Sequence, residues 1–135
     1  RDSFCLTAAR EFKQAVGIEI SESSIDWAHR NAKQNHIGNC RFLQGDAANI
    51  FAEVNFDPAK TAVVIDPPRK GSNPEFLDQL IEFAPRRVVY VSCNPATQIR
   101  DLEYVKGHYR ITRIKPFDLF PQTRHLECVV TLERE

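Results

Sequence analysis

The chain has 135 residues, of which 42% are hydrophobic and 27% charged, and its 18 basic residues balance its 18 acidic residues. These values are typical of one globular domain and argue against a purely electrostatic nucleic-acid binder. The longest apolar run is too short to cross a membrane, and the opening residues lack the pattern of a secretory signal peptide. We therefore expect a reducing, intracellular location.

The four cysteines, Cys5, Cys40, Cys93 and Cys128, form no C-x-x-C pair. This spacing predicts no metal site, and a chain with enough apolar residues for a core does not need a disulfide framework. We expect free thiols, of which Cys5 and Cys40 serve as packing residues and Cys128 is buried in its strand.

The first part of the chain alternates between helix-like and strand-like segments. In chain order, the pattern predicts a helix over 4–12, a strand over 15–20, a helix over 24–36, a strand and turn over 40–47, and a short helical piece over 48–54.

The second part continues the alternation. A β-branched strand over 61–66 ends at two prolines, and Pro74 suits the first turn of a helix over 73–84. A strand over 87–92, a helix over 96–105 and strands over 109–120 and 127–133 follow.

Strands that alternate with helices, several of them apolar on both faces, predict a parallel sheet covered on both sides. The fold class is therefore α/β, doubly wound and Rossmann-like. Only residues 121–126 separate the last two strands, which is too short for a helical crossover, so these strands should pair antiparallel at one edge. In this class, ligands bind beyond the carboxyl ends of the strands.

Four successive predicted strands end in an acid or a thiol: Glu19, Asp46, Asp66 and Cys93. One such acid is more often a helix cap or a solvated turn residue, but four at equivalent positions favour a binding rim. A carboxylate at Glu19 suits the two hydroxyls of a ribose, and Asp46 suits an exocyclic amine such as that of adenine.

The loop over residues 66–69, with the sequence Asp-Pro-Pro-Arg, is more specific. Two prolines fix its backbone directly after a buried strand, which holds the carboxylate of Asp66 and projects Arg69. The alternative is a rigid end of the strand without further function.

Three segments, 63–71, 90–104 and 117–129, resemble in this order the C-terminal signatures of the RNA 5-methyluridine methyltransferases. The likeness is to the eukaryotic tRNA (uracil-54-C5)-methyltransferase branch. It implies an S-adenosylmethionine-dependent enzyme that methylates carbon 5 of a uridine in RNA, uridine 54 of the tRNA T-loop, with tRNA as the partner and no metal.

The resemblance also implies roles for individual residues. Cys93 falls on the nucleophile and Glu127 on the general base. Three acids fall on the cofactor side of the site, namely Glu19, Asp46 and Asp66, and Asp66 also lines the active site. Arg69 and His125 are the candidates for contact with RNA.

The resemblance has one departure. The family has a first strand and a glycine-rich loop, and in this fold that strand lies between the strands at 15–20 and 61–66. Neither is recognisable here, so we expect residues 1–135 to form the C-terminal part of one methyltransferase catalytic domain. The isolated chain is then expected to be inactive and to bind S-adenosylmethionine weakly or not at all.

Three alternatives stay open at this point. A uridine-5-methyltransferase could act on rRNA instead of tRNA. An amino-methyltransferase would have an aromatic residue where Arg69 stands and no use for Cys93 or Glu127. A non-catalytic RNA-binding or tRNA-folding module would keep the fold without the reaction.

Overall fold

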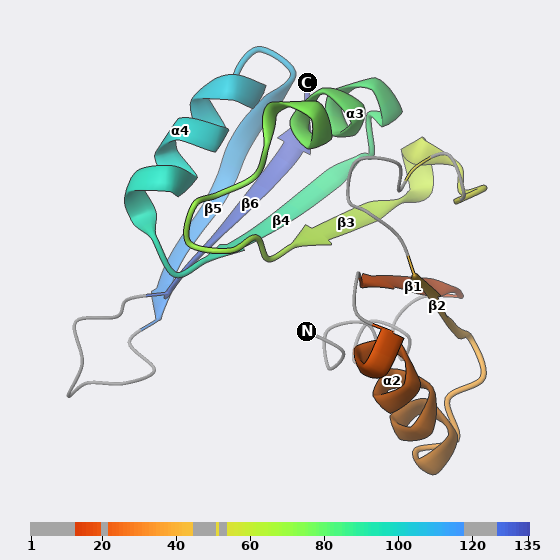
Figure 1. Ribbon diagram of the computed structural model, residues 1–135. Coiled ribbons are helices and arrows are strands. Elements are labelled where there is room, and N and C mark those ends of the chain that lie inside the picture. Colours follow the sequence, from red (N-terminus) through yellow and green to blue (C-terminus); the bar gives the residue numbers. More distant parts are fainter. Residues whose placement is uncertain (1–12, 20–21, 45–50, 52–53, 118–126) are drawn as a thin grey trace, which may run out of the picture. The chain divides into compact units, whose positions relative to one another are not determined.

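The computed structural model describes residues 13–19, 22–44, 51, 54–117 and 127–135. The chain divides into two compact units, residues 1–54 and 55–135, and each is described by itself (Figure 1). The helix predicted over 4–12, the strand residues 118–120 and most of the helical piece over 48–54 lie outside the described residues.

The unit of residues 1–54 contains a strand, a helix and a second strand. Strand β1 (Ala15–Glu19) pairs parallel with β2 (Cys40–Gln44), and α2 (Glu22–Gln34) connects them. One side of α2 packs through Ala28 and Ala32, and Cys40 contacts this small core. The predicted elements are confirmed, with α2 beginning two residues before its predicted start, and Cys40 is a packing residue as expected.

The unit of residues 55–135 is a four-stranded sheet with two α-helices. The strands lie in the order β3 (Ala62–Ile65), β4 (Arg87–Ser92), β6 (Glu127–Arg134) and β5 (Tyr109–Phe117). Strands β3 and β4 are parallel, whereas β6 is antiparallel to both β4 and β5. The predicted antiparallel pairing of the last two strands is confirmed, and β6 lies between β4 and β5.

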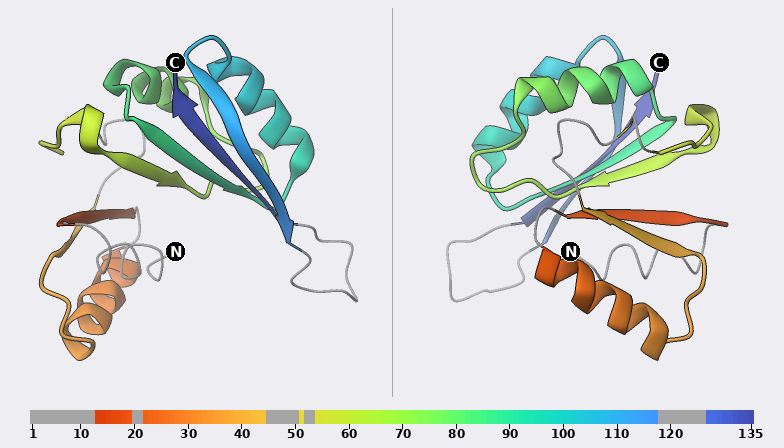
Figure 2. Two further views of the ribbon diagram at one scale, coloured as in Figure 1. Left: turned by 180° about the vertical axis from the view of Figure 1, so that it is seen from behind. Right: turned by 45° about the vertical axis from the view of Figure 1, so that its right-hand side comes forward.

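Helices α3 (Pro74–Phe83) and α4 (Pro95–Val105) lie on the same face of this sheet, and a short 3₁₀ helix (Pro58–Lys60) precedes β3 (Figure 2). The register places Tyr90 opposite Val130 and Val88 opposite Leu132. These four side chains are buried, together with Phe76, Leu77 and Leu80 of α3. The core of this unit therefore lies between the sheet and the two helices.

An Asn-Pro pair begins each of these helices. The side-chain oxygen of Asn73 accepts a hydrogen bond from the amide of Phe76 at 2.7 Å, and that of Asn94 accepts one from the amide of Ala96 at 3.2 Å. The asparagines satisfy amides that have no partner within the helix, and the prolines fit the first helical position because they have no amide hydrogen to satisfy. The predicted starts at 73 and 96 are thus each one residue from the observed starts.

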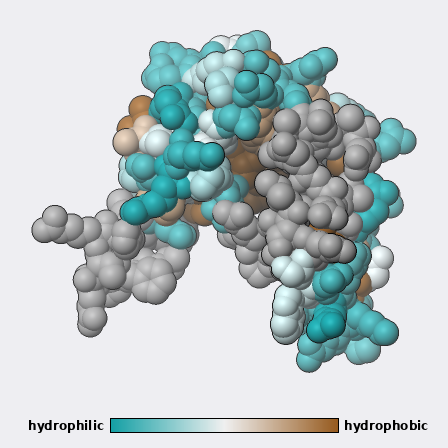
Figure 3. All heavy atoms as spheres, viewed as in Figure 1, coloured by the Kyte–Doolittle hydropathy of each residue, from teal (hydrophilic) through white to brown (hydrophobic). Residues whose placement is uncertain are grey.

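Among the described strands of this unit, β3 and β5 form the two edges of the sheet. Both carry exposed apolar side chains, namely Val64 in β3 and Ile111 and Ile114 in β5. Figure 3 shows that hydrophilic residues cover much of the visible surface and that hydrophobic residues form smaller patches between them. Cys128 in β6, which we expected to be buried, is only half-buried, because it lies at the end of its strand.

The described part of the chain includes no helix that is both long and apolar enough to span a membrane.

Candidate active site

Two loops leave the sheet at the same edge. Asp66 directly follows β3, and Cys93 directly follows β4. Because β3 and β4 are parallel, with Ile65 opposite Tyr90, their carboxyl ends point in the same direction. The structure therefore places Asp66 and Cys93 at the edge where ligands bind in α/β sheets.

Cys93 is a free, partly exposed thiol between two residues with fixed positions. Ser92 is buried, and its hydroxyl accepts a hydrogen bond from the amide of Asn94 and donates one to the carbonyl of Asn94, both at 3.0 Å. Asn94 is also the cap of α4. The backbone on either side of Cys93 is thus held by hydrogen bonds, and the thiol lies at the positive end of α4, where a negative charge is favoured.

Glu127 is the first residue of β6, the strand beside β4. The last pair between these antiparallel strands is Ser92 with Cys128. Cys93 and Glu127 are the residues that directly flank this last pair, one on each strand. The two residues that the resemblance assigned to nucleophile and base thus lie at the same end of the β4–β6 ladder.

The buried amide of Gln98 in α4 joins the two strands at this end of the sheet. Its nitrogen donates to the carbonyl of Cys128 at 3.1 Å and to the carbonyl of Tyr90 at 3.3 Å. Cys128 is the second residue of β6, and Tyr90 lies near the end of β4. The contacts of Gln98 therefore fix the strand ends next to Glu127 and Cys93.

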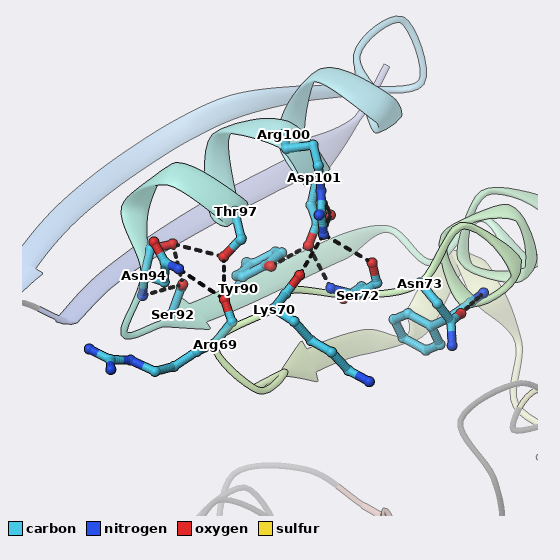
Figure 4. A network of polar contacts seen from close by, with 11 residues as sticks. Arg69, Lys70, Ser72, Asn73, Tyr90, Ser92, Asn94, Thr97, Arg100 and Asp101 are labelled. Carbon is cyan, nitrogen blue, oxygen red and sulfur yellow. Dashed lines mark hydrogen bonds and ion pairs between the residues drawn. The ribbon is translucent and has the colours of Figure 1, made fainter.

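The loop that begins at Asp66 closes in a tight turn. The amide of Gly71 donates to the carbonyl of Pro68 at 2.8 Å. In Figure 4 the side chains of Arg69 and Lys70 extend away from α4, while their carbonyl oxygens point towards it. Both side chains are exposed, so two positive charges project from the edge that carries Cys93.

Side chains of α4 hold this turn through its backbone (Figure 4). The carbonyl of Arg69 accepts hydrogen bonds from Asn94 at 3.0 Å and from the hydroxyl of Thr97 at 2.8 Å. The carbonyl of Lys70 accepts one from Arg100 at 2.7 Å. The helix that begins beside Cys93 is therefore also the support of the loop that follows Asp66.

Asp101 completes this support from inside the protein. Its carboxylate is buried and accepts hydrogen bonds from the amide of Ser72 at 2.8 Å and from the hydroxyl of Tyr90. Burial raises the pKa of Tyr90 above its ordinary value, and the hydrogen bond to Asp101 raises it further. The hydroxyl of Tyr90 therefore keeps its proton and remains a donor to Asp101.

The residues that support the turn were not among those predicted from the sequence. Asn94, Thr97 and Asp101 are three and four residues apart, so they share one face of α4. A polar stripe with this spacing resembles a solvent-exposed helix face, whereas here it lies against a loop. The available signal for this support was the spacing of Thr97 and the Arg100-Asp101 pair, which lie one helical turn apart.

Replacement of Gly71 by alanine is expected to destabilise the protein by roughly 2 kcal/mol, since it combines backbone strain with steric conflict. Gly71 has a φ of +83°, and a Cβ there would lie 2.5 Å from Nη2 of Arg100 and 2.9 Å from Oδ2 of Asp101. Urea unfolding of the full-length protein measures the effect. Gly107→Ala is the matched control, because Gly107 has a φ of +98° but a Cβ there meets nothing within 4 Å. Equal decreases in the free energy of unfolding of Gly71→Ala and Gly107→Ala would show that the turn is not tightly packed against α4.

The remaining predicted site residues are only partly described. Glu19 is the last residue of β1, as predicted, but the structure describes only its backbone. Asp46 and His125 lie outside the described residues. Among the residues that the structure does describe, no group of three or more His, Cys, Asp or Glu side chains could hold a metal ion.

The whole chain, residues 1–135, matches the family model described as tRNA (Uracil-5-)-methyltransferase. The chain belongs to this family. The resemblance noted on the three sequence segments is thereby confirmed, as is the Rossmann-like α/β class of the fold.

Members of the tRNA (uracil-5-)-methyltransferase family from yeasts are similar to this chain over nearly all of its length. The tRNA (uracil(54)-C(5))-methyltransferase of Schizosaccharomyces pombe is 44% identical, over 97% of this chain and 26% of that protein. The Saccharomyces cerevisiae protein of the same name is 38% identical, over 97% of this chain and 21% of that protein. The chain thus spans about a quarter of the length of these relatives.

A solved structure of the family shares the fold. The crystal structure of Pyrococcus abyssi tRNA (uracil-54, C5)-methyltransferase in complex with S-adenosyl-L-homocysteine is 34% identical, with a TM-score of 0.82 over 96% of this chain and 31% of that chain.

Proposed function

We propose that the protein that contains this chain transfers a methyl group from S-adenosylmethionine to carbon 5 of a uridine in tRNA, uridine 54 of the T-loop. The observation that carries this proposal is the last pair of the β4–β6 ladder, Ser92 with Cys128, which Cys93 and Glu127 flank at the edge where Asp66 follows β3. Relatives named as tRNA uracil-54 methyltransferases support the choice of substrate. An enzyme with this substrate works inside the cell, where tRNA is found.

The reaction needs a nucleophile because carbon 5 of uracil reacts poorly with a methyl sulfonium. Addition of the Cys93 thiolate to carbon 6 converts the ring to an enolate with electron density on carbon 5. The cofactor supplies the methyl group that carbon 5 takes up. Glu127 then removes the proton from carbon 5, and the electron pair of that bond expels the sulfur of Cys93. This step releases the methylated uridine and regenerates the free thiol.

Acids at the carboxyl ends of the strands are suited to hold the cofactor. In this proposal Glu19 accepts hydrogen bonds from the ribose hydroxyls, Asp46 accepts one from the adenine amine, and Asp66 lies on the side of the reacting group. The end of β1 for Glu19 and the loop after β3 for Asp66 are positions that suit such a ligand. No contact with the cofactor is needed from the supports in α4.

The substrate base has to leave its stack before Cys93 can reach carbon 6. In this proposal Arg69 contacts the RNA, since its side chain is exposed on the turn beside the site, and His125 is a second RNA contact. The assignment of residues 1–135 to one catalytic domain also stays a prediction.

Nucleoside analysis of RNA from cells that lack the gene tests the proposed function. We expect 5-methyluridine to disappear from tRNA and to return when the full-length protein is supplied. Loss of 5-methyluridine from rRNA alone would contradict the tRNA assignment. Unchanged 5-methyluridine in both RNAs would contradict the enzymatic function and favour a non-catalytic RNA-binding module.

A further inference from the structure

We propose that Asp101 is a positioning residue for this reaction: its buried carboxylate holds the turn after Asp66 in register with Cys93. The inference rests on the proposed function, because it assigns a contribution to the rate of methyl transfer. Asp101 itself lies within the protein and touches neither substrate nor cofactor in this proposal.

Burial of the Asp101 carboxylate costs free energy. Asp101 is 2% exposed, and a charged group in such a place is tolerated only when several donors surround it. The donors here are the hydroxyl of Tyr90, the amide of Ser72 and the guanidinium of Arg100, whose Nη2 lies 3.2 Å from Oδ1. An apolar side chain would fill the same space without this cost. The structure thus retains a carboxylate where it joins a strand, a turn and a helix.

Arg100 and Asp101 together hold the turn by hydrogen bonds to its backbone. Arg100 donates to the carbonyls of Lys70 at 2.7 Å and Ser72 at 3.4 Å, while Asp101 accepts from the amide of Ser72. Neighbouring side chains of one helix therefore hold both the carbonyl and the amide of Ser72. Arg100 is oriented in part by its ion pair with Asp101, so loss of the carboxylate weakens both contacts.

Helix α4 connects the residue after Cys93 with the turn after Asp66. Asn94 caps α4 one residue after Cys93, and the same helix reaches the turn through Asp101 two turns later. A shift of the turn relative to α4 is therefore a shift of Asp66 and Arg69 relative to the nucleophile. A misplacement of this kind slows a reaction that depends on alignment while it leaves most of the binding surface intact.

The test compares Asp101→Asn and Tyr90→Phe in the full-length protein with steady-state methylation of tRNA. We expect kcat to fall about 10- to 100-fold in Asp101→Asn and less in Tyr90→Phe, with the KM for tRNA within about threefold of the wild-type value. Tyr104→Phe is the matched control. Tyr104 also lies in α4 and donates a hydrogen bond to an aspartate, Asp78, but this contact is not with the turn. We expect this control to keep the wild-type kcat.

Amide hydrogen exchange gives a readout that does not depend on activity. We expect the amide of Ser72 to exchange faster in Asp101→Asn than in the wild-type protein, while amides of β5 are unchanged. A wild-type kcat in Asp101→Asn would overturn the positioning role, and so would an unchanged exchange rate at Ser72. A fall in kcat that is matched by an equal fall in the folded fraction would also overturn it. If instead the wild-type protein methylates no RNA, the proposed function is wrong. Slow hydrogen exchange at the Ser72 amide that is lost in Asp101→Asn would then still show that Asp101 holds the turn.

Discussion

Replacement of Cys93 by alanine is expected to lower the rate of uridine methylation by roughly 10⁴-fold or more, because no other group can replace a covalent nucleophile at that point of the site. The structure supports this expectation in two ways. Cys93 is partly exposed, and its backbone is fixed by Ser92 and Asn94 on either side. Removal of one sulfur atom there leaves the surrounding hydrogen bonds intact, so tRNA binding should persist.

The measurement uses tRNA that carries 5-fluorouridine. Fluorine at carbon 5 cannot leave as a cation, so the wild-type protein should form a stable adduct that migrates as a protein–RNA complex in a denaturing gel. Cys93→Ala should form none. Cys128→Ala is the matched control, since it removes a half-buried thiol from the neighbouring strand, and it should form the adduct at the wild-type rate. An adduct that survives in Cys93→Ala would assign the nucleophile to another residue.

Replacement of Glu127 by glutamine is expected to have a different signature. Thiol addition and methyl transfer precede removal of the carbon 5 proton, so the variant should accumulate a methylated covalent complex with ordinary tRNA. Turnover should fall about 10²- to 10⁴-fold, the range typical of a lost general base. Mass spectrometry of the protein–RNA complex distinguishes this trapped species from an unmethylated adduct.

Glu133→Gln is the control for this second prediction. Glu133 lies on the same strand as Glu127, and its contacts are ion pairs with Arg87 at 2.8 Å and Arg110 at 3.8 Å. Its hydrogen bond with Arg87 holds the pKa of this carboxyl below its ordinary value, so it is ionised at neutral pH. Glu133 lies near the other end of β6 from Glu127, so we expect Glu133→Gln to keep the wild-type turnover. Normal turnover by Glu127→Gln, with no trapped complex, would place the base elsewhere.

Much of this site could be predicted from sequence because strand ends carry a local signal. Asp66 and Cys93 each follow a β-branched run that stops at a proline or an Asn-Pro pair, and the carboxyl ends of parallel strands meet at one edge. The position of Glu127 at the same end of the ladder as Cys93 depends instead on β6 lying between β4 and β5. That order arises from long-range pairing, which hydrophobic periodicity does not encode. The resemblance to a family suggested this pair, whereas the residue pattern alone did not.

The supports of the site were harder to predict for a different reason. Gln98 and Asp101 are polar and lie in a helix, and such residues usually face solvent. In this protein both are buried because they satisfy backbone groups of neighbouring segments, namely the carbonyls of Tyr90 and Cys128 and the amide of Ser72. The pattern of a helix does not show which of its polar residues will meet such groups.

Helix α4 begins beside Cys93 and also supports the turn after Asp66. These two contacts constrain the number of residues between Cys93 and Asp101 in related proteins. Asp101 follows Cys93 by eight residues (101 − 93), and the intervening chain is the cap and first turns of the helix. Insertion of a single residue there would rotate Asp101 by about 100° around the helix axis and turn it away from Ser72. The distance along the chain from the thiol to this aspartate should therefore tolerate neither insertion nor deletion, whereas the segment between α4 and β5 is not bound by this constraint. The length of the helical segment between Cys93 and Asp101 is therefore a structural requirement of the proposed site.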